Sequence, residues 1–223
     1  MTVLKLQSSR DEAGNVRTFV FDTGGLTWIA GQSQGYDLLQ IGGSEEDHER
    51  WFTISSAPSE GEIHISTRIT DSKFKQTLNG LMPGDEIQCH DLEGDFTWEE
   101  IGDPVVLVAG GIGITPYRSI LIERSKKGKP LNATLLYFIR TAEIPFLQEL
   151  EALAAKHAEF TLRSVIGEDI SADTILRHAP GAQSRLVYLS GPEPMVEAVG
   201  ADLQARGNAV KQDWFPGYDE KNY

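Results

Sequence analysis

VVLVAGGIGITP, residues 105–116, is the stretch of this sequence that says most about its fold. Five apolar residues are followed by three glycines within four positions and then by the pair Thr115-Pro116. Such a run is typical of a strand that turns into a helix beside a phosphate group, because glycine lets backbone N–H groups approach the ligand. The usual dinucleotide fingerprint has a third glycine where this sequence has Pro116, so the loop matches that pattern only in part.

The sequence around and after this loop alternates between apolar strand patterns and helix patterns. This alternation predicts parallel strands joined by right-handed crossovers, and hence an α/β doubly wound domain with a parallel five-stranded sheet. The expected strands are 105–109, 133–139, 160–166, 186–190 and 209–213, and the expected helices are 116–127, 143–157, 171–178 and 192–205.

The sequence before residue 103 has short alternating runs separated by turns, which predict an antiparallel six-stranded β-barrel. Examples of the runs are 16–21, 36–41, 51–55, 63–67 and 86–90. One helix, 73–80, interrupts them after Ser72, which has the residue type of an N-cap. We therefore expect two domains: the barrel at 1–102, and the α/β domain with a C-terminal aromatic tail at 103–223.

The composition limits the chemistry of the chain. A single cysteine, Cys89, excludes an internal disulfide and an iron–sulfur cluster held by this chain's own thiolates. The five histidines have no metal-binding spacing, so no metal site is expected. A formal charge of -13 argues against nucleic acid and anionic lipid as partners. No signal segment or apolar run of about 20 residues is present, so we expect a cytoplasmic protein without a membrane anchor.

Two turns of the second half have the residues of a nucleotide site. Gly110, Gly111 and Gly113 would let the backbone approach a pyrophosphate, while Thr115 would cap the next helix and Pro116 would occupy its first position. A glycine turn between a strand and a helix without a ligand is the alternative.

The second turn is Ser190-Gly191-Pro192, which follows the fourth strand and should lie on the same rim of the sheet. Arg140 ends the second strand, where an ordinary dinucleotide fold has an acidic residue for the ribose. Arg140 therefore indicates a different nucleotide-binding lineage, a 2′-phosphate partner or an ordinary surface cation.

HERWFTISSAP, residues 48–58, is the most informative segment of the barrel half. In a strand, Arg50, Phe52 and Ser56 share one face, and Thr53 lies on the other. A cation, aromatic rings and hydroxyls this close together could hold a planar, anionic ligand, although a half-buried edge strand explains the pattern equally well.

The Arg50-x-Phe52-Thr53-x-x-Ser56 pattern resembles the Arg-x-Tyr-Ser-x-x-Ser flavin motif of the ferredoxin-NADP reductase superfamily. Residues 110–116 resemble its pyridine-nucleotide loop, 190–195 its Cys-Gly-Pro motif and 94–98 its Gly-x-Phe segment, in matching order along the chain. The resemblance implies a flavin-binding barrel followed by an NAD(P)-binding domain, with the two ligands meeting between them.

Matched residue by residue, the resemblance implies that Arg50 pairs with the flavin phosphate, Phe52 lies against the isoalloxazine ring and Thr53 bonds near its N5. Residues 67–75 resemble the family's second flavin segment, with Ser72 at the start of a helix that faces the pyrophosphate. Residues 210–218 resemble the closing strand that brings an acidic and an aromatic residue to the flavin. Phe215 is the first choice for that aromatic, ahead of Trp214 and Tyr218.

Three departures from the family pattern stand out. Phe52 replaces the usual Tyr and Thr53 the usual Ser, which keeps a ring and a hydroxyl but loses a phenol. Ser190 replaces the Cys expected beside the nicotinamide, so thiol-assisted positioning is absent.

The resemblance therefore implies a stand-alone, FAD-dependent NAD(P)H oxidoreductase. A hydride would pass from NAD(P)H to flavin N5, and electrons would then pass to a separate carrier such as a ferredoxin, a flavodoxin or an oxygenase component. The alternatives are a free-flavin or ferric reductase and, in another class, a non-catalytic nucleotide-sensing subunit. FAD is expected in preference to FMN, and NADH or dual use in preference to NADPH alone.

The candidate site residues fall into two groups. The expected catalytic residues are Thr53, Ser190 and Phe215. The expected cofactor-binding residues are Arg50, Phe52, Thr53, Ser56, Thr67, Arg68, Ser72, Phe74, Lys75, Gly110, Gly111, Gly113, Thr115, Pro116, Arg140, Ser190, Gly191, Pro192, Met195, Asp213, Trp214 and Phe215.

Overall fold

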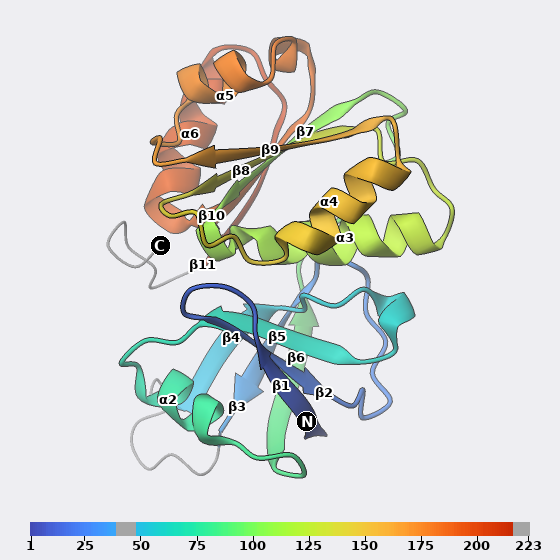
Figure 1. The fold of residues 1–223 in the computed structure, drawn as a ribbon, viewed down its shortest axis with the longest axis vertical. Coiled ribbons are helices and arrows are strands. Elements are labelled where there is room, and N and C mark those ends of the chain that lie inside the picture. The colour runs from blue at the N-terminus through green and yellow to red at the C-terminus, as the bar shows by residue number, and fades with distance from the viewer. Residues whose placement is uncertain (39–47, 216–223) are drawn as a thin grey trace.

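The computed structural model describes residues 1–38 and 48–215, with the side chain of Phe215 left out. A sheet of antiparallel strands lies at one end of the molecule and a parallel sheet with helices at the other (Figure 1). The predicted fold class is confirmed. The proposed division at residue 102 falls in the segment that links the last strand of the first sheet to the first strand of the second.

The antiparallel sheet curls into a six-stranded barrel. Its strand order is β4-β3-β6-β1-β2-β5, and an isolated bridge between Ile54, just after β4, and Ile65 of β5 brings the two edges of the curled sheet together. Alternating apolar residues such as Phe19 and Phe21 fill its interior. The elements are β1 (Thr2–Asp11), β2 (Val16–Phe21), β3 (Ser33–Asp37), β4 (Glu49–Thr53), η1 (Pro58–Glu60), β5 (Ile63–Arg68), α2 (Lys73–Gly80) and β6 (Glu86–Glu93).

The parallel sheet has the order β11-β10-β7-β8-β9. The chain winds outward from β7 to β9 and then crosses to the other side of β7 for β10 and β11. The elements are β7 (Val105–Gly110), η2 (Gly111–Ile114), α3 (Thr115–Lys126), β8 (Ala133–Ile139), α4 (Leu147–Lys156), β9 (Phe160–Ile166), α5 (Ala172–His178), η3 (Ala182–Ser184), β10 (Val187–Pro192), α6 (Glu193–Ala205) and β11 (Val210–Phe215).

Helices cover both faces of this parallel sheet. Tyr117 of α3 and Leu150 of α4 belong to one buried cluster, and Ile175 of α5 and Val196 of α6 belong to another. Figure 1 shows α3 lying next to the barrel. The strand order reverses between β7 and β10, and this switch point is where doubly wound sheets bind their ligands.

Three local predictions need correction. The helix expected at 143–157 begins only at Leu147, because Pro145 disfavours a helical residue before it and Phe146 has a left-handed backbone. Thr115 is not an N-cap: the 3₁₀ turn η2 precedes α3, so Ile114 is the N-cap and Pro116 is the second helical residue. The strand expected at 36–41 is β3, which starts at Ser33, and residues 39–41 lie outside the described part.

Candidate functional site

The two predicted nucleotide turns pack against each other at the switch point. A Cβ atom added to Gly113 would lie 2.2 Å from the carbonyl oxygen of Ser190 and 2.8 Å from the amide nitrogen of Gly191. A Cβ atom on Gly191 would lie 2.6 Å from Cε of Met195, and one on Gly110 would lie 2.9 Å from the same atom. A side chain at Gly113 would collide with the backbone of Ser190, so glycine allows the two turns to form one rim at the carboxyl ends of β7 and β10.

Ser190 and Asp213 lie side by side on this rim, because they are register partners on β10 and β11. The Ser190 hydroxyl donates a hydrogen bond of 3.1 Å to Oδ2 of Asp213. Burial raises the pKa of the Asp213 carboxyl to about 7; the bond from Ser190 opposes this shift and the charge of Asp95 adds to it. A serine hydroxyl and a carboxyl that titrates near neutrality therefore occupy the place where the sequence predicts hydride transfer.

Two residues of the predicted flavin motif, Phe52 and Ser56, make contacts within the barrel itself. The Phe52 ring lies in the barrel core, with its centroid 6.1 Å from Tyr36 and 5.8 Å from Phe74, and the residue is only 7% exposed. Phe52 and Phe74 therefore use most of their surface in packing. The Ser56 hydroxyl accepts a hydrogen bond from the backbone of His64, so it already has a partner within the barrel.

Three side chains of the two predicted flavin segments have buried polar atoms without partners among the described residues. They are the hydroxyls of Thr53 and Ser72 and the Nε atom of Arg68. Ser72 stands at the N-cap of α2 but makes no side-chain cap bond. Because most buried polar groups in folded proteins are hydrogen-bonded, unmet groups on these two segments fit a polar ligand such as a flavin.

The three remaining flavin-site candidates of these segments, Arg50, Thr67 and Lys75, lie in or beside the wall of the barrel. Arg50 is half-buried and donates a 2.6 Å bond to the carbonyl oxygen of Glu49. The hydroxyl of Thr67 contacts the carbonyl oxygen of Arg68 at 3.5 Å, and Lys75 is buried on the first turn of α2. The cations expected near a flavin phosphate are therefore held within or close to the barrel wall.

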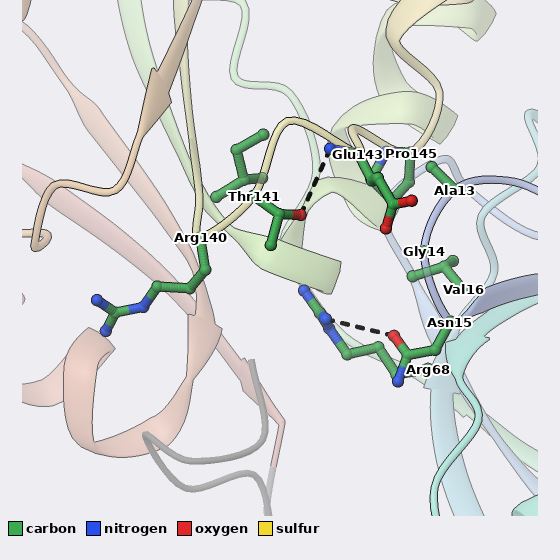
Figure 2. Close-up of a pocket in the computed structure, with 10 residues that line it drawn as sticks. Ala13, Gly14, Asn15, Val16, Arg68, Arg140, Thr141, Glu143 and Pro145 are labelled. Atoms are coloured by element: carbon green, nitrogen blue, oxygen red, sulfur yellow. Dashed lines mark hydrogen bonds between the residues drawn. The ribbon is translucent and has the colours of Figure 1, made fainter.

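A pocket of about 280 Å³ opens between the two sheets (Figure 2). The β1–β2 hairpin lines one side, where Asn15 accepts a 3.4 Å bond from Nη1 of Arg68. Residues that follow β8 line the other side, including Glu143. In Figure 2 the Arg140 side chain points away from Asn15 and Glu143, and it pairs with Asp169 at 3.1 Å. This ion pair does not distinguish between the three interpretations of Arg140, namely a different nucleotide-binding lineage, a 2′-phosphate partner and a surface cation.

The closing strand brings two more predicted residues to the rim. In the β10–β11 register Trp214 pairs with Gly191 and Phe215 with Pro192. The Trp214 side chain is 45% exposed, and Tyr218 lies outside the described residues. The choice of the aromatic that covers the flavin stays a prediction.

Arg118 of α3 contacts both domains, although no sequence motif indicates it. It is 2% exposed and donates hydrogen bonds to both oxygens of Glu60, to both oxygens of Glu149 and to the carbonyl oxygen of Ser55, at 2.7–3.1 Å. Burial alone would raise the pKa of Glu60, but the bonds and charge of Arg118 outweigh it and lower that pKa. Arg118 thus fixes the end of the flavin-motif strand to the nucleotide domain.

Ser119 and Glu123 extend the same contact along α3. The Ser119 hydroxyl donates a 2.6 Å bond to the carbonyl oxygen of Ser56, and Glu123 accepts a 2.8 Å bond from the backbone of Ser59. No sequence motif marks these residues, because their partners lie about 60 residues away in the chain. Their spacing on one helical face is the only local signal.

Comparison with known proteins supports the assignment of the second half. Residues 107–201 match the family model of the oxidoreductase NAD-binding domain. The electron transfer component of toluate 1,2-dioxygenase from Pseudomonas putida is 28% identical over 193 residues, which are 82% of this chain and 56% of that protein. The reductase component of propane 2-monooxygenase from Mycolicibacterium goodii is 29% identical, over 95% of this chain and 64% of its own length. The chain thus spans less than two thirds of these relatives.

Solved structures share the two-domain arrangement. The FAD/NAD-binding domain of nitric oxide dioxygenase from Vibrio cholerae superposes with a TM-score of 0.79 at 22% identity, covering 96% of this chain and 98% of that one. Ferredoxin-NADP+ reductase from Plasmodium falciparum superposes with a TM-score of 0.79 at 15% identity, covering 96% and 95%. An antiparallel barrel followed by an NAD-binding parallel sheet defines a class of two-domain oxidoreductases. This chain has the same two-domain fold as these ferredoxin-NADP reductase-like structures, and its second half matches the oxidoreductase NAD-binding family.

Among the residues that the structure describes, no helix combines the length and the apolar character needed to cross a bilayer.

Proposed function

We propose that this protein is an FAD-dependent NAD(P)H oxidoreductase that passes electrons to a separate protein acceptor. The observation that carries the proposal is the buried, unpartnered hydroxyl of Thr53, at the position where the family motif places the partner of flavin N5. The unpartnered groups of Ser72 and Arg68 on the second flavin segment support it. When bound, the flavin supplies a hydride acceptor that can afterwards release electrons singly.

The chain's own residues bind and align the two ligands. Backbone N–H groups of the turn at 110–113 receive the pyrophosphate of NAD(P)H, and the start of α2 with Arg50 receives the flavin phosphate. Ser190 and Asp213 lie at the nicotinamide end of the rim. Catalysis rests mainly on alignment, because the reacting atoms belong to the two cofactors.

The relatives support FAD and a protein acceptor. The Vibrio cholerae domain is described as FAD/NAD-binding, and the toluate and propane relatives are described as an electron transfer and a reductase component of oxygenase systems. An oxygenase component, or a small carrier that serves one, is therefore the acceptor we favour. The net charge of -13 suits a partner with a basic docking patch.

Reconstitution of the purified chain tests this proposal. We expect FAD to remain bound through gel filtration, FMN to bind more weakly, and NADH or NADPH to support reduction of ferricyanide. A flavin that exchanges freely during turnover would favour the free-flavin reductase instead. A chain that binds neither flavin would contradict the proposal and favour a nucleotide-sensing subunit.

Thr53→Val is expected to have opposite effects on stability and on catalysis. The substitution removes a buried hydroxyl that has no partner, so the flavin-free protein should gain on the order of 1 kcal/mol of stability. Flavin reduction by NADH should slow by about tenfold or more, since the bond near N5 is lost. Urea unfolding and stopped-flow absorbance measure the two effects. Thr53→Ser, which keeps the hydroxyl, is the control and should retain the rate; equal rates for the valine and serine variants would contradict the assigned role.

Asp213→Asn should change how stability depends on pH. The folded-state pKa of about 7 lies above the ordinary value of 3.8, so between these values the folded chain binds more protons than the unfolded chain. The contribution of this carboxyl to the free energy of unfolding is therefore fully present at low pH and is lost as the pH rises toward 7. The loss is at most about 4 kcal/mol. Urea unfolding at pH 5 and at pH 8 measures the effect. The free energy of unfolding should fall less between these two pH values in the Asn variant than in the wild type.

The exposed carboxyl of Asp202, on the adjacent helix α6, provides the control, and Asp202→Asn should leave the pH dependence unchanged. The same ionisation should affect hydride transfer, because a carboxylate near the nicotinamide stabilises the positive charge that develops there. The wild-type rate should rise with pH through about 7 and the Asn rate should stay flat. An unchanged inflection in the Asn variant would rule out Asp213 as its source.

A further inference from the structure

A histidine and two carboxylates from three strands meet on the outer face of the barrel. They are Asp37 of β3, Glu49 of β4 and His90 of β6, and one ligand atom of each lies within 4.8 Å of the others. On the same strands Tyr36, Phe52 and Cys89 face the core, so strand alternation places the three residues outside. The cluster shares no residue with the flavin motif or with the nucleotide rim.

Gly35 makes room for this arrangement. It is the register partner of both His90 and Trp51, and a Cβ atom at this position would lie 2.4 Å from Cε1 of His90. The imidazole therefore crosses over β3 and meets the Trp51 ring edge-on, with 5.9 Å between centroids. Because the central strand has no side chain here, a residue of β6 reaches carboxylates on β3 and β4.

The distances in the cluster match the spacing of ligand atoms around a metal ion. Nε2 of His90 lies 3.4 Å from Oδ2 of Asp37 and 3.6 Å from Oε1 of Glu49. Hydrogen bonds from a ring nitrogen to oxygen span about 2.7–3.2 Å. Ligand atoms around a tetrahedral zinc ion, with bonds of about 2.0–2.2 Å, are roughly 3.3–3.6 Å apart.

The outer contacts orient the ligands toward a common centre. Nδ1 of His90 lies 3.0 Å from Oδ2 of Asp91, so the tautomer with its proton on Nδ1 would donate to this carboxylate and present the Nε2 lone pair to an ion bound beside Asp37 and Glu49. The Trp51 indole donates a 3.1 Å bond to Oε1 of Glu49. A carboxylate behind the ligating histidine is the usual second shell of a zinc site.

We propose that Asp37, Glu49 and His90 bind one divalent ion of the zinc class, with water in the remaining position. One imidazole and two carboxylates suit zinc, whereas calcium and magnesium prefer all-oxygen sites with more ligands. The ion joins the three neighbouring strands β4, β3 and β6 and so stabilises the barrel. Sequence spacing gave no signal for this site, because its ligands lie at 37, 49 and 90 and a strand pairing brings them together.

The test uses the full chain after chelator treatment, titrated with Zn²⁺ by calorimetry and with Co²⁺ by visible absorption. We expect one ion per chain, the strong visible bands of low-symmetry four-coordinate cobalt, and a rise in melting temperature with Zn²⁺. His90→Gln should lower the affinity at least 100-fold, and Asp91→Asn should lower it about 10- to 100-fold. Asp37→Asn provides a second ligand variant in case His90→Gln does not fold.

His178→Gln is the matched control. Nε2 of His178 also lies 3.2 Å from a carboxylate oxygen, that of Glu168, but this pair is no part of a three-ligand group among the described residues. The control should bind Zn²⁺ like the wild type. Absence of binding below about millimolar Zn²⁺, or equal affinity in the His90 and His178 variants, would overturn the proposal. Neither outcome depends on flavin binding or on reductase activity.

Discussion

Arg118→Ala is expected to destabilise the protein by about 3 kcal/mol, because it leaves the buried carbonyl of Ser55 and the partly exposed carboxylates of Glu60 and Glu149 without their donor. The guanidinium donates to Glu60, Glu149 and the carbonyl oxygen of Ser55 while only 2% exposed. Burial alone would lower the pKa of Arg118, but its bonds to the two glutamates outweigh it and raise that pKa. Urea unfolding of the two proteins measures the difference.

Arg206→Ala is the control for this variant. Arg206 also binds two carboxylates, Asp173 and Asp202, but its side chain is 35% exposed, and surface ion pairs contribute about 0–1 kcal/mol. Equal costs for the two variants would contradict the role of Arg118 in joining the domains.

The Arg118 substitution should also slow hydride transfer in protein that remains folded. Arg118 and Ser119 hold the carbonyl oxygens of Ser55 and Ser56, which follow Thr53 on the flavin-motif segment. A displacement of about 1 Å between the two ligand sites costs on the order of 100-fold in rate. We expect a fall of that size in the rate of flavin reduction, with FAD still bound.

Gly113→Ala is expected to abolish NAD(P)H-dependent activity, with a loss of about 100-fold or more. The new Cβ atom would lie 2.2 Å from the carbonyl oxygen of Ser190, and backbone on both sides prevents an easy adjustment. The turn that we propose to receive the pyrophosphate must therefore move away from β10. Flavin binding should survive, because the predicted flavin segments belong to the barrel. Steady-state kinetics with NADH and the retained FAD absorbance separate the two effects.

Gly80→Ala provides the matched control, since nothing lies within 4 Å of a Cβ atom at that helical position. It should leave both activity and flavin binding unchanged. Normal NADH kinetics in the Gly113 variant would mean that the turn does not bind the hydride donor.

Local patterns were sufficient to predict most of the fold. Apolar residues at every second position predicted the antiparallel sheet of the first half, and the alternation of strands and helices predicted the parallel sheet of the second. The helix predicted at 73–80 and the strand predicted at 133–139 have the same bounds as α2 and β8. The glycine turn at 110–113 and the turn at Ser190 were placed on one rim because parallel strands end at the same edge of a sheet. These features depend on neighbouring residues, which a sequence shows directly.

The remaining features depend on contacts between distant segments. Alternation placed Phe52 beside Arg50 on one face, but closure of the barrel decides that its ring packs on Tyr36 and Phe74. Arg118 meets Ser55 across 63 residues of sequence, so no local pattern indicates the pair. The raised pKa of Asp213 likewise arises from burial on the rim, which the pairing of β10 and β11 creates.

Anaerobic titration of the FAD-reconstituted chain with NADH and with NADPH tests the central claim most directly. The barrel and the glycine turn should bring the two cofactors together, so about one equivalent of the preferred nucleotide should bleach the flavin absorbance, and air should restore it. A chain that binds FAD but stays oxidised with excess NADH and excess NADPH would contradict the claim that these two sites form one hydride-transfer centre.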